Sequence, residues 1–359
     1  MTKYLSKKIT NLSIICAIMV VMIHSTTDVV NLPGSMETTH GLNVSTFIQM
    51  FFSEGLARIA VPLFFLFSGF LFFYKFEPTV NNFKIKYKKR FFSQVIPYLF
   101  WSIFTFLLVL AAQISPKTAQ FFSNFDISSY SIWNFLNTIF IKPINSPLWF
   151  LRDLIVLTVL SPLIYILIKR LPAVFLALIF IIWVLNVKIF IVRSVTPIFF
   201  CTGAFLSIFN IKVNIKIPKI VTLISSVAFL ALLVVSAYHY CTIDVAELVA
   251  GRLDSFIDVI EKIFIPIGII SFWGIYDLIC KEDTKIIPFA KNSFVIYASH
   301  ALIVRFIRKI LFVIVGVNQI TSIVVYFLIP VIVISIIILI CIFLNRFCPK
   351  FYNLISGNR

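Results

Sequence analysis

The sequence predicts an all-α fold, a polytopic membrane bundle of about ten transmembrane helices that forms a single domain over residues 1–359. Hydrophobic residues make up 60% of the chain and charged residues only 13%, and the mean hydropathy is +1.04. The apolar residues form long runs, whereas the strands of a membrane barrel alternate polar and apolar positions. No segment between the runs is long enough to form its own core, so we expect no appended soluble domain.

Ten runs are long enough to cross about 30 Å of hydrocarbon at about 1.5 Å per helical residue. In chain order they cover 9–30, 50–74, 94–114, 149–168, 172–188, 194–210, 220–240, 259–280, 292–311 and 320–345. Five prolines lie inside or near these runs, where a helical bundle tolerates them: Pro62, Pro97, Pro162, Pro266 and Pro330. The first run exceeds the roughly 7–15 residues of a signal-peptide core, so we expect an uncleaved span.

The basic residues orient the predicted helices. Most of the 31 Lys and Arg lie at the N-terminus and in alternate loops, most densely between Lys75 and Arg90. The positive-inside rule places these loops and both termini in the cytoplasm. Topology thus accounts for the formal charge of +17, and we expect no nucleic-acid partner. The loops on the opposite side, 31–49 and 115–148, are longer and more polar.

The sequence lacks the common metal and nucleophile motifs. Its six Cys show no CxxC or ligand spacing, and we expect those within the spans to be packing residues. It also has no HExxH, no GxSxG elbow and no glycine-rich phosphate loop. We therefore expect a site without a metal.

His24 is the most informative residue, because an imidazole inside a bilayer loses its hydration and is usually functional. Counted from the cytoplasmic ends of their helices, five polar residues lie about 21–24 Å from the inner face. These are His24, Arg58, Arg152, Asp153 and Arg305. They predict a shared cavity that opens outward. The alternative is that each marks the outer end of its own helix, with long Arg side chains reaching the interface.

Two further residues belong to this hypothesis. Glu54 lies one turn before Arg58 and could pair with it or orient His24. Asp153 is a second candidate to orient the imidazole. His300 lies lower in its helix, where it could line the same channel or make a structural hydrogen bond. A histidine near neutral pH is a general base for a hydroxyl, and arginines bind carbonyl, phosphate or carboxylate oxygens, which fits group transfer to an alcohol or proton-coupled transport.

The second cytoplasmic loop is strongly basic, with Lys84, Lys86, Lys88, Lys89 and Arg90. These side chains could bind a polyanionic donor such as coenzyme A through charge-assisted hydrogen bonds. Positive-inside topology together with binding of anionic membrane lipid is the alternative.

Several segments in this order resemble the acyltransferase 3 family of integral membrane proteins. They are NLSIICAIMVVMIHSTT, RIAVPLFFLFSGFLFF, KKRFFSQVIPYLFW, SPLWFLRDLIVLTVLSPLIY and NSFVIYASHALI. The resemblance covers residues from about 5 to 345. It implies ten helices in the bacterial inner membrane and transfer of an acyl group, usually acetyl from acetyl-CoA, to a hydroxyl of a cell-envelope polysaccharide or lipid-linked glycan.

The resemblance also implies roles for single residues. His24 matches the catalytic histidine, and Arg58, Arg90 and Arg152 match site residues. Family members commonly carry an Arg eleven residues before that histidine, where this chain has Ser13. Lys8, just over one turn earlier, could supply the missing charge at the donor entrance.

The resulting hypothesis is that His24 takes the proton of a sugar hydroxyl, or relays the acyl group, while Arg58 and Arg152 stabilise the oxyanion. The competing hypothesis is a transporter or flippase for a glycan or small acid. Such transporters are often built from repeats, and this sequence shows none. A non-catalytic membrane scaffold is the third possibility, and succinyl transfer is an alternative to acetyl transfer.

Overall fold

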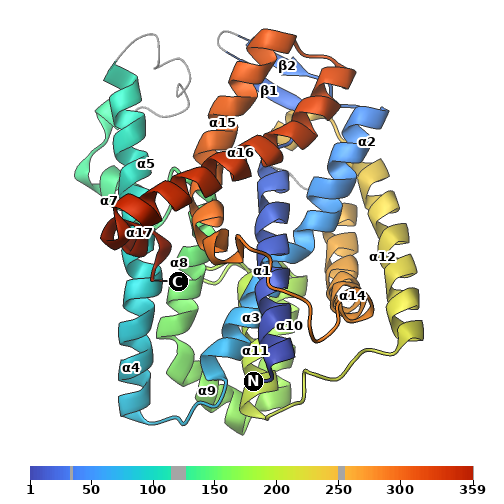
Figure 1. Ribbon diagram of the computed structural model, residues 1–359. Coiled ribbons are helices and arrows are strands. Elements are labelled where there is room, and N and C mark those ends of the chain that lie inside the picture. Colours follow the sequence, from blue (N-terminus) through green and yellow to red (C-terminus); the bar gives the residue numbers. More distant parts are fainter. Residues whose placement is uncertain (33–34, 115–126, 250–254, 359) are drawn as a thin grey trace.

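The computed structural model describes residues 1–32, 35–114, 127–249 and 255–358, and confirms the all-α fold. Figure 1 shows helices packed side by side, with a two-stranded hairpin at the end of the molecule opposite the N-terminus. The strands are β1 (Val29–Leu32) and β2 (Ser35–Thr38), which pair antiparallel. We refer to these two ends as the hairpin end and the N-terminal end.

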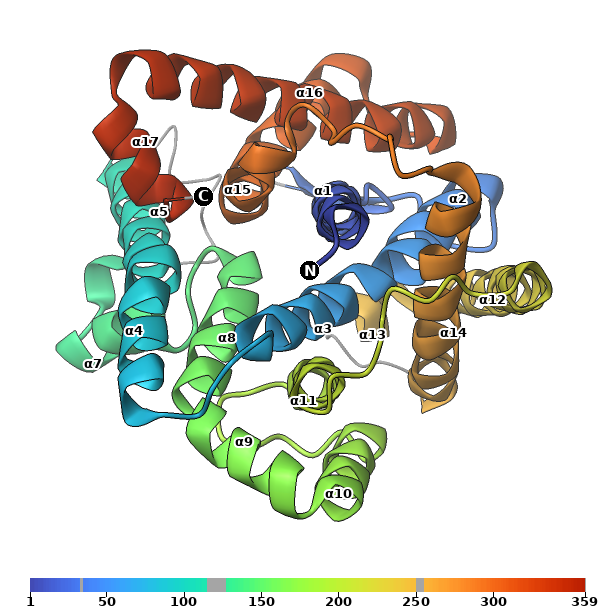
Figure 2. The same ribbon diagram turned by 60° about the horizontal axis from the view of Figure 1, so that its bottom comes forward.

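Helix α1 (Lys3–His24) runs through the middle of the bundle, where α3, α15 and α16 surround it (Figure 2). The Thr2 side chain caps its start by accepting a hydrogen bond from the Leu5 amide. The helix ends at His24, six residues earlier than predicted, because the chain then turns into β1. His24 therefore lies in the last turn of α1.

The second and third predicted spans are continuous helices that contain irregular turns. In the second, α2 (Val44–Met50) leads through the π-helical turn η1 (Phe51–Gly55) and the 3-10 turn η2 (Leu56–Ile59) into α3 (Ala60–Phe73). In the third, α4 (Val80–Arg90), the π-helical turn η3 (Phe91–Val95) and α5 (Ile96–Ile114) follow one another. Such π-helical turns inside α-helices are frequent at functional sites.

The middle of the chain forms shorter elements. They are η5 (Ile127–Ser129), α7 (Ile132–Phe140), η6 (Ser146–Leu148), α8 (Trp149–Val159), α9 (Ser161–Arg170), α10 (Pro172–Val184) and α11 (Val195–Ile208). Helices α8 and α9 meet at an angle of 63°. Pro162 lies in the first turn of α9 and lacks the amide that would continue α8, which explains the break.

Six further elements follow: α12 (Lys219–Tyr240), α13 (Val245–Val249), α14 (Ser255–Ile279), η7 (Ala290–Asn292), α15 (Ser293–Val315) and α16 (Gln319–Phe347). A final helix, α17 (Pro349–Ser356), was not predicted. The indole of Trp101 donates to the Ile355 carbonyl at 3.1 Å and so ties α17 to α5.

Each of the ten predicted ranges contains a helix, but fewer are long and apolar enough to cross a membrane. Among the described residues, five helices meet that criterion, or six if the bent pair α8–α9 counts as one span. Helices α10 and α11 are shorter than the roughly 20 residues that a span needs. The number of ten spans stays a prediction.

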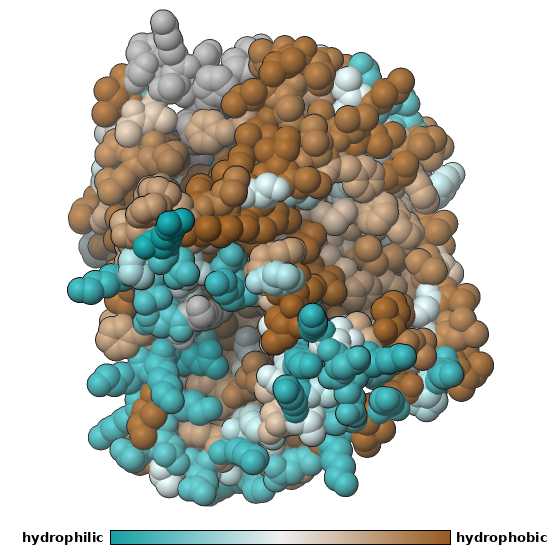
Figure 3. All heavy atoms as spheres, viewed as in Figure 1, coloured by the Kyte–Doolittle hydropathy of each residue, from teal (hydrophilic) through white to brown (hydrophobic). Residues whose placement is uncertain are grey.

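The surface separates into an apolar and a hydrophilic part. Figure 3 shows hydrophobic residues over most of the molecule, whereas hydrophilic ones gather at the N-terminal end, over α4 and around the start of α1. This asymmetry is the one that the basic residues predicted. Its assignment to the cytoplasmic side stays a prediction.

Candidate active site

His24 faces a second histidine. The imidazole of His24 is half-buried, and its ring centre lies 5.1 Å from that of His300, with 45° between the ring planes. His300 lies on α15, which packs along α1. Within the described part of the chain, no side chain or backbone group forms a hydrogen bond with His24. The pair was separated by 276 positions in the sequence, and only packing brings it together.

Three guanidinium groups are close enough to interact electrostatically with His24, those of Arg58, Arg305 and Arg308. Arg308 donates from Nη1 to the Thr26 carbonyl at 2.7 Å, two residues after His24. The structure thus unites three of the five residues predicted at one depth, His24, Arg58 and Arg305, and adds Arg308. The spacing of Arg308, three residues after Arg305 on one helix, was the signal for it in the sequence.

Arg58 is held by two carboxylates. It forms an ion pair with Glu54, one helical turn away, and its Nε lies 3.5 Å from Oε1 of Glu261 on α14. The Tyr240 hydroxyl donates to Glu54 at 3.2 Å and contacts Glu261 at 3.3 Å. Glu54 therefore pairs with Arg58 and does not orient His24. Sequence reasoning missed Glu261 and Tyr240, because they come from distant helices.

Arg152 and Asp153 form a separate cluster. The Nε and Nη2 atoms of Arg152 donate to Oδ1 of Asp153 at 3.0 and 2.7 Å, and Nη2 also donates to the Ile191 carbonyl at 2.7 Å. Nη1 donates to the Ile141 carbonyl. Oδ2 of the buried Asp153 accepts the Arg193 amide at 3.0 Å. These bonds join two loops to α8, so Asp153 does not orient His24, and a catalytic role of Arg152 stays a prediction.

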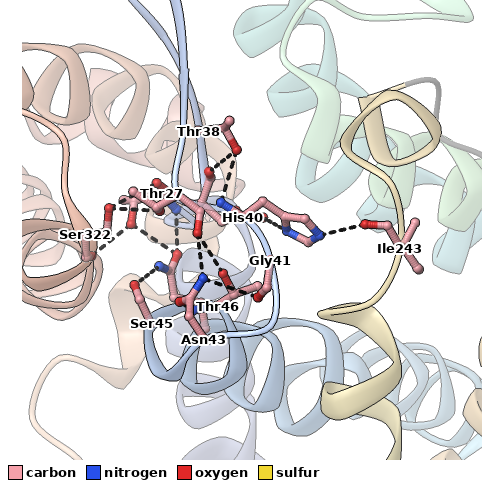
Figure 4. Close-up of polar contacts among 12 residues, drawn as sticks. Thr27, Thr38, His40, Gly41, Asn43, Ser45, Thr46, Ile243 and Ser322 are labelled. Atoms are coloured by element: carbon pink, nitrogen blue, oxygen red, sulfur yellow. Dashed lines mark hydrogen bonds and ion pairs between the residues drawn. The ribbon is translucent and has the colours of Figure 1, made fainter.

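A polar network at the hairpin end fixes the segment that follows α1 (Figure 4). The amide of Thr27 donates to Gln49 at 2.7 Å, and its hydroxyl donates to the Ser322 carbonyl at 2.8 Å. His40 lies between Asp28, at 3.0 Å, and the Ile243 carbonyl, at 3.1 Å. The segment that follows His24 is thereby tied to α2, α16 and the loop after α12.

The predicted basic loop is largely helix α4. Its first turn is capped by Thr79, whose hydroxyl accepts the Asn82 amide at 3.2 Å. A cavity of about 550 Å³ opens beside it. Its lining includes Lys86, Lys89 and Arg90 among the predicted donor-binding residues. Lys88 instead lines a neighbouring cavity together with Gly357 and Asn358.

A second cavity, of about 290 Å³, lies inside the bundle. Its polar lining consists of Ser13, Ser68, Arg90, Ser293 and Tyr297, and its remaining lining is aromatic and aliphatic. Arg90 lines both cavities, so its side chain marks the place where they approach each other. Ser13, at the position of the family arginine, opens into this space, with its hydroxyl bonded to the Ile9 carbonyl.

The hypothesis that Lys8 supplies the missing charge is wrong. The Lys8 side chain is 1% exposed, and its Nζ donates to Asp277 at 2.7 Å and to the Trp273 carbonyl at 2.9 Å. Both partners lie on α14. Five residues turn a helix by about 500°, so Lys8 and Ser13 point to different sides of α1.

A site with paired imidazoles and several guanidinium groups has the composition for group transfer. Among the described residues, no group of three His, Cys, Asp or Glu side chains is placed to hold a metal ion.

The comparisons with known proteins identify the family. A family profile described as an acyltransferase domain matches residues 7–346. The chain therefore belongs to the acyltransferase 3 family. Its several long apolar helices are those of a multi-pass membrane protein.

A curated relative supports this assignment. The chain is 29% identical over 240 residues to the succinoglycan biosynthesis protein ExoH of Rhizobium meliloti (strain 1021). The alignment covers 65% of this chain and 61% of ExoH, so the chain spans about three fifths of that relative. No solved structure matches the chain significantly.

Proposed function

We propose that the protein is an O-acetyltransferase of the bacterial inner membrane. It moves an acetyl group from acetyl-CoA, bound from the cytoplasm, to a hydroxyl of a cell-envelope polysaccharide or lipid-linked glycan. Family membership supports acyl transfer, and the name of the relative, a succinoglycan biosynthesis protein, supports a polysaccharide acceptor.

The observation that carries the proposal is the succession of two cavities that share Arg90. The outer one presents Lys86, Lys89 and Arg90, whose charges suit the phosphates of coenzyme A. The inner one is smaller and mostly apolar, which suits a thin pantetheine arm. Its lining includes residues of α1 and α15, the two helices that carry His24 and His300.

The chemistry follows from the residues beyond the inner cavity. In the proposed reaction His24 takes the proton of the acceptor hydroxyl, whose oxygen then attacks the thioester carbonyl. Arg305 and Arg308 stabilise the negative charge that develops on the carbonyl oxygen, because both guanidinium groups act on the space around His24. Arg58, fixed by Glu54 and Glu261, adds a third positive charge. The acceptor arrives from the hairpin end, where α1 stops at His24.

The test uses membranes from a deletion strain that expresses the protein, supplied with radiolabelled acetyl-CoA. Label should enter the envelope glycan, and His24→Ala should abolish incorporation while the protein stays inserted. The matched control is His239→Ala, since this histidine lies at the end of α12, outside the site. Incorporation that is unchanged in the His24 variant would refute the assigned role. Export of an unmodified glycan without labelling would identify a transporter instead.

A further inference from the structure

The second imidazole, His300, has a defined tautomer. Its Nδ1 lies 3.0 Å from the Ile296 carbonyl and 2.8 Å from the Tyr297 carbonyl. Carbonyl oxygens only accept hydrogen bonds, so Nδ1 carries the proton and Nε2 carries a lone pair. The backbone of α15 therefore keeps this ring oriented as a base.

The Nε2 atom of His300 has no partner among the described residues, although the whole residue is buried, with 0% exposed surface. A buried polar atom without a hydrogen bond is rare in a folded protein, because it loses its water and gains nothing in return. If His300 had only a structural role, its Nδ1 bonds would suffice, and nothing would account for a buried Nε2 without a hydrogen bond.

His300 lies one helical turn beyond residues of α15 that line the inner cavity. Ser293 and Tyr297 line the cavity, and His300 follows Tyr297 by three residues, on the same face of α15 and about 4.5 Å further along. On α1, Ser13 lines the cavity, and His24 lies eleven residues, or about three turns, beyond it on the same face. His300 is thus the imidazole next to the donor cavity, and His24 lies at the open end of α1.

Acyl transfer from a thioester to a hydroxyl needs one proton transfer. The C–S bond breaks, a C–O bond forms, and the proton of the hydroxyl must finally reach the departing sulfur. The acceptor comes from the hairpin end and the donor from the opposite side. A single imidazole would have to reach both heteroatoms, whereas two adjacent rings divide the task.

We infer that His300 is a second catalytic residue, which passes the hydroxyl proton from His24 to the coenzyme A sulfur. The proposed proton transfers take place in this order. His24 takes the proton from the hydroxyl and gives a proton to Nε2 of His300. His300 then donates that proton to the thiolate. Ring centres 5.1 Å apart require only a small rotation, and catalytic hydrogen bonds often tighten when substrates bind. The inference rests on the proposed function.

The test compares His300→Asn and His300→Gln with the wild type, in membranes from the deletion strain supplied with radiolabelled acetyl-CoA. The Asn amide can keep the hydrogen bond to the helix carbonyl, yet neither amide can carry the proton. The maximal rate should fall at least about 100-fold. The acetyl-CoA KM should stay within about twofold, because donor binding is unchanged. Ser299→Ala is the matched control, since Ser299 also bonds to a carbonyl four residues earlier, at 2.7 Å from Val295, and should keep the wild-type rate.

Two results would overturn the inference: either His300 variant keeping its rate within about threefold of wild type, or a loss that appears as a raised KM or a lowered thermal midpoint. Failure of the proposed function is distinct, because the wild type itself would then label no glycan.

Discussion

The arginines that were predicted at the depth of His24 differ in how many of their hydrogen-bond donors the protein already satisfies. Arg152 donates to Asp153 and to two loop carbonyls, and Arg58 is paired with Glu54 and Glu261. Arg305, which acts on His24, shows no hydrogen bond or ion pair within the described chain. A guanidinium group without such partners is available to an oxyanion, whereas a bonded one stabilises the fold.

Replacing Arg152 should therefore affect stability more than chemistry. Arg152→Ala leaves the buried Asp153 carboxylate without its ion pair, which costs about 3–5 kcal/mol for a buried pair. Thermal unfolding of the purified protein in detergent should show a clearly lower midpoint. Arg305→Ala should keep the wild-type midpoint and lose acyl transfer. Equal midpoints for both variants would contradict this division.

The residues predicted to bind the acyl donor also differ, in whether they line the cavities. Arg90 lines both cavities, while Lys84, on the same helix, lines neither of them. Arg90→Gln should raise the acetyl-CoA KM about tenfold or more, since a hydrogen bond to a charged group contributes about 1.5–3 kcal/mol. Lys84→Gln is the control for a general loss of positive charge. If both variants shift the KM equally, α4 attracts the donor only by its overall charge.

At the level of elements, α3 and α11 approach each other closely at two glycines. A Cβ atom on Gly69 would lie 1.9 Å from the Phe200 carbonyl oxygen, and one on Gly203 would lie 2.0 Å from that of Leu66. Small residues let two membrane helices approach to this distance. Because α3 continues from the turn that carries Arg58, this contact also supports the site.

Gly69→Ala should prevent this approach. The added methyl group meets backbone, which cannot move aside, so we expect a loss of about 3 kcal/mol or more and little folded protein in the membrane. Size-exclusion profiles of the solubilised protein report the folded fraction. Gly316→Ala is the control, since a Cβ there meets nothing within 4 Å and only the positive φ of 71° is strained. A normal profile for Gly69→Ala would disprove the close contact.

The hairpin network adds a pH dependence. The hydrogen bond with Asp28 raises the pKa of His40 above its ordinary value, helped by the charges of Asp28 and Asp244 and opposed by burial. A folded-state pKa above the unfolded value means that the stabilisation is fully present below about pH 6.5 and is lost as the pH rises through the folded pKa.

The thermal midpoint should therefore fall as the pH is raised from 6 to 9, and this slope should be smaller in His40→Gln. The variant keeps a polar side chain but cannot titrate. An identical slope in both proteins would show that His40 does not contribute to it.

For the molecule as a whole, much of the architecture was predictable. Composition and long apolar runs predicted an all-α membrane bundle, and each predicted range contains a helix. Helix ends were harder, because they depend on tertiary contacts. The predicted end of the first span, residue 30, lies in β1, where pairing with β2 replaces helical hydrogen bonds. Likewise α17 is held by Trp101 of α5, a contact without a local signal.

The sequence by itself determined that apolar helices must pack in a membrane and that His24 and Arg58 are set among them, because hydrophobicity and helical spacing are local properties. Only the tertiary structure decided which polar groups meet. His300 packs beside His24, and Glu261 forms an ion pair with Arg58 and contacts Tyr240. Arg152 bonds to two loops, and Lys8 forms an ion pair with Asp277. These outcomes depend on the rotation and neighbours of each helix, which long-range packing sets and no local pattern records.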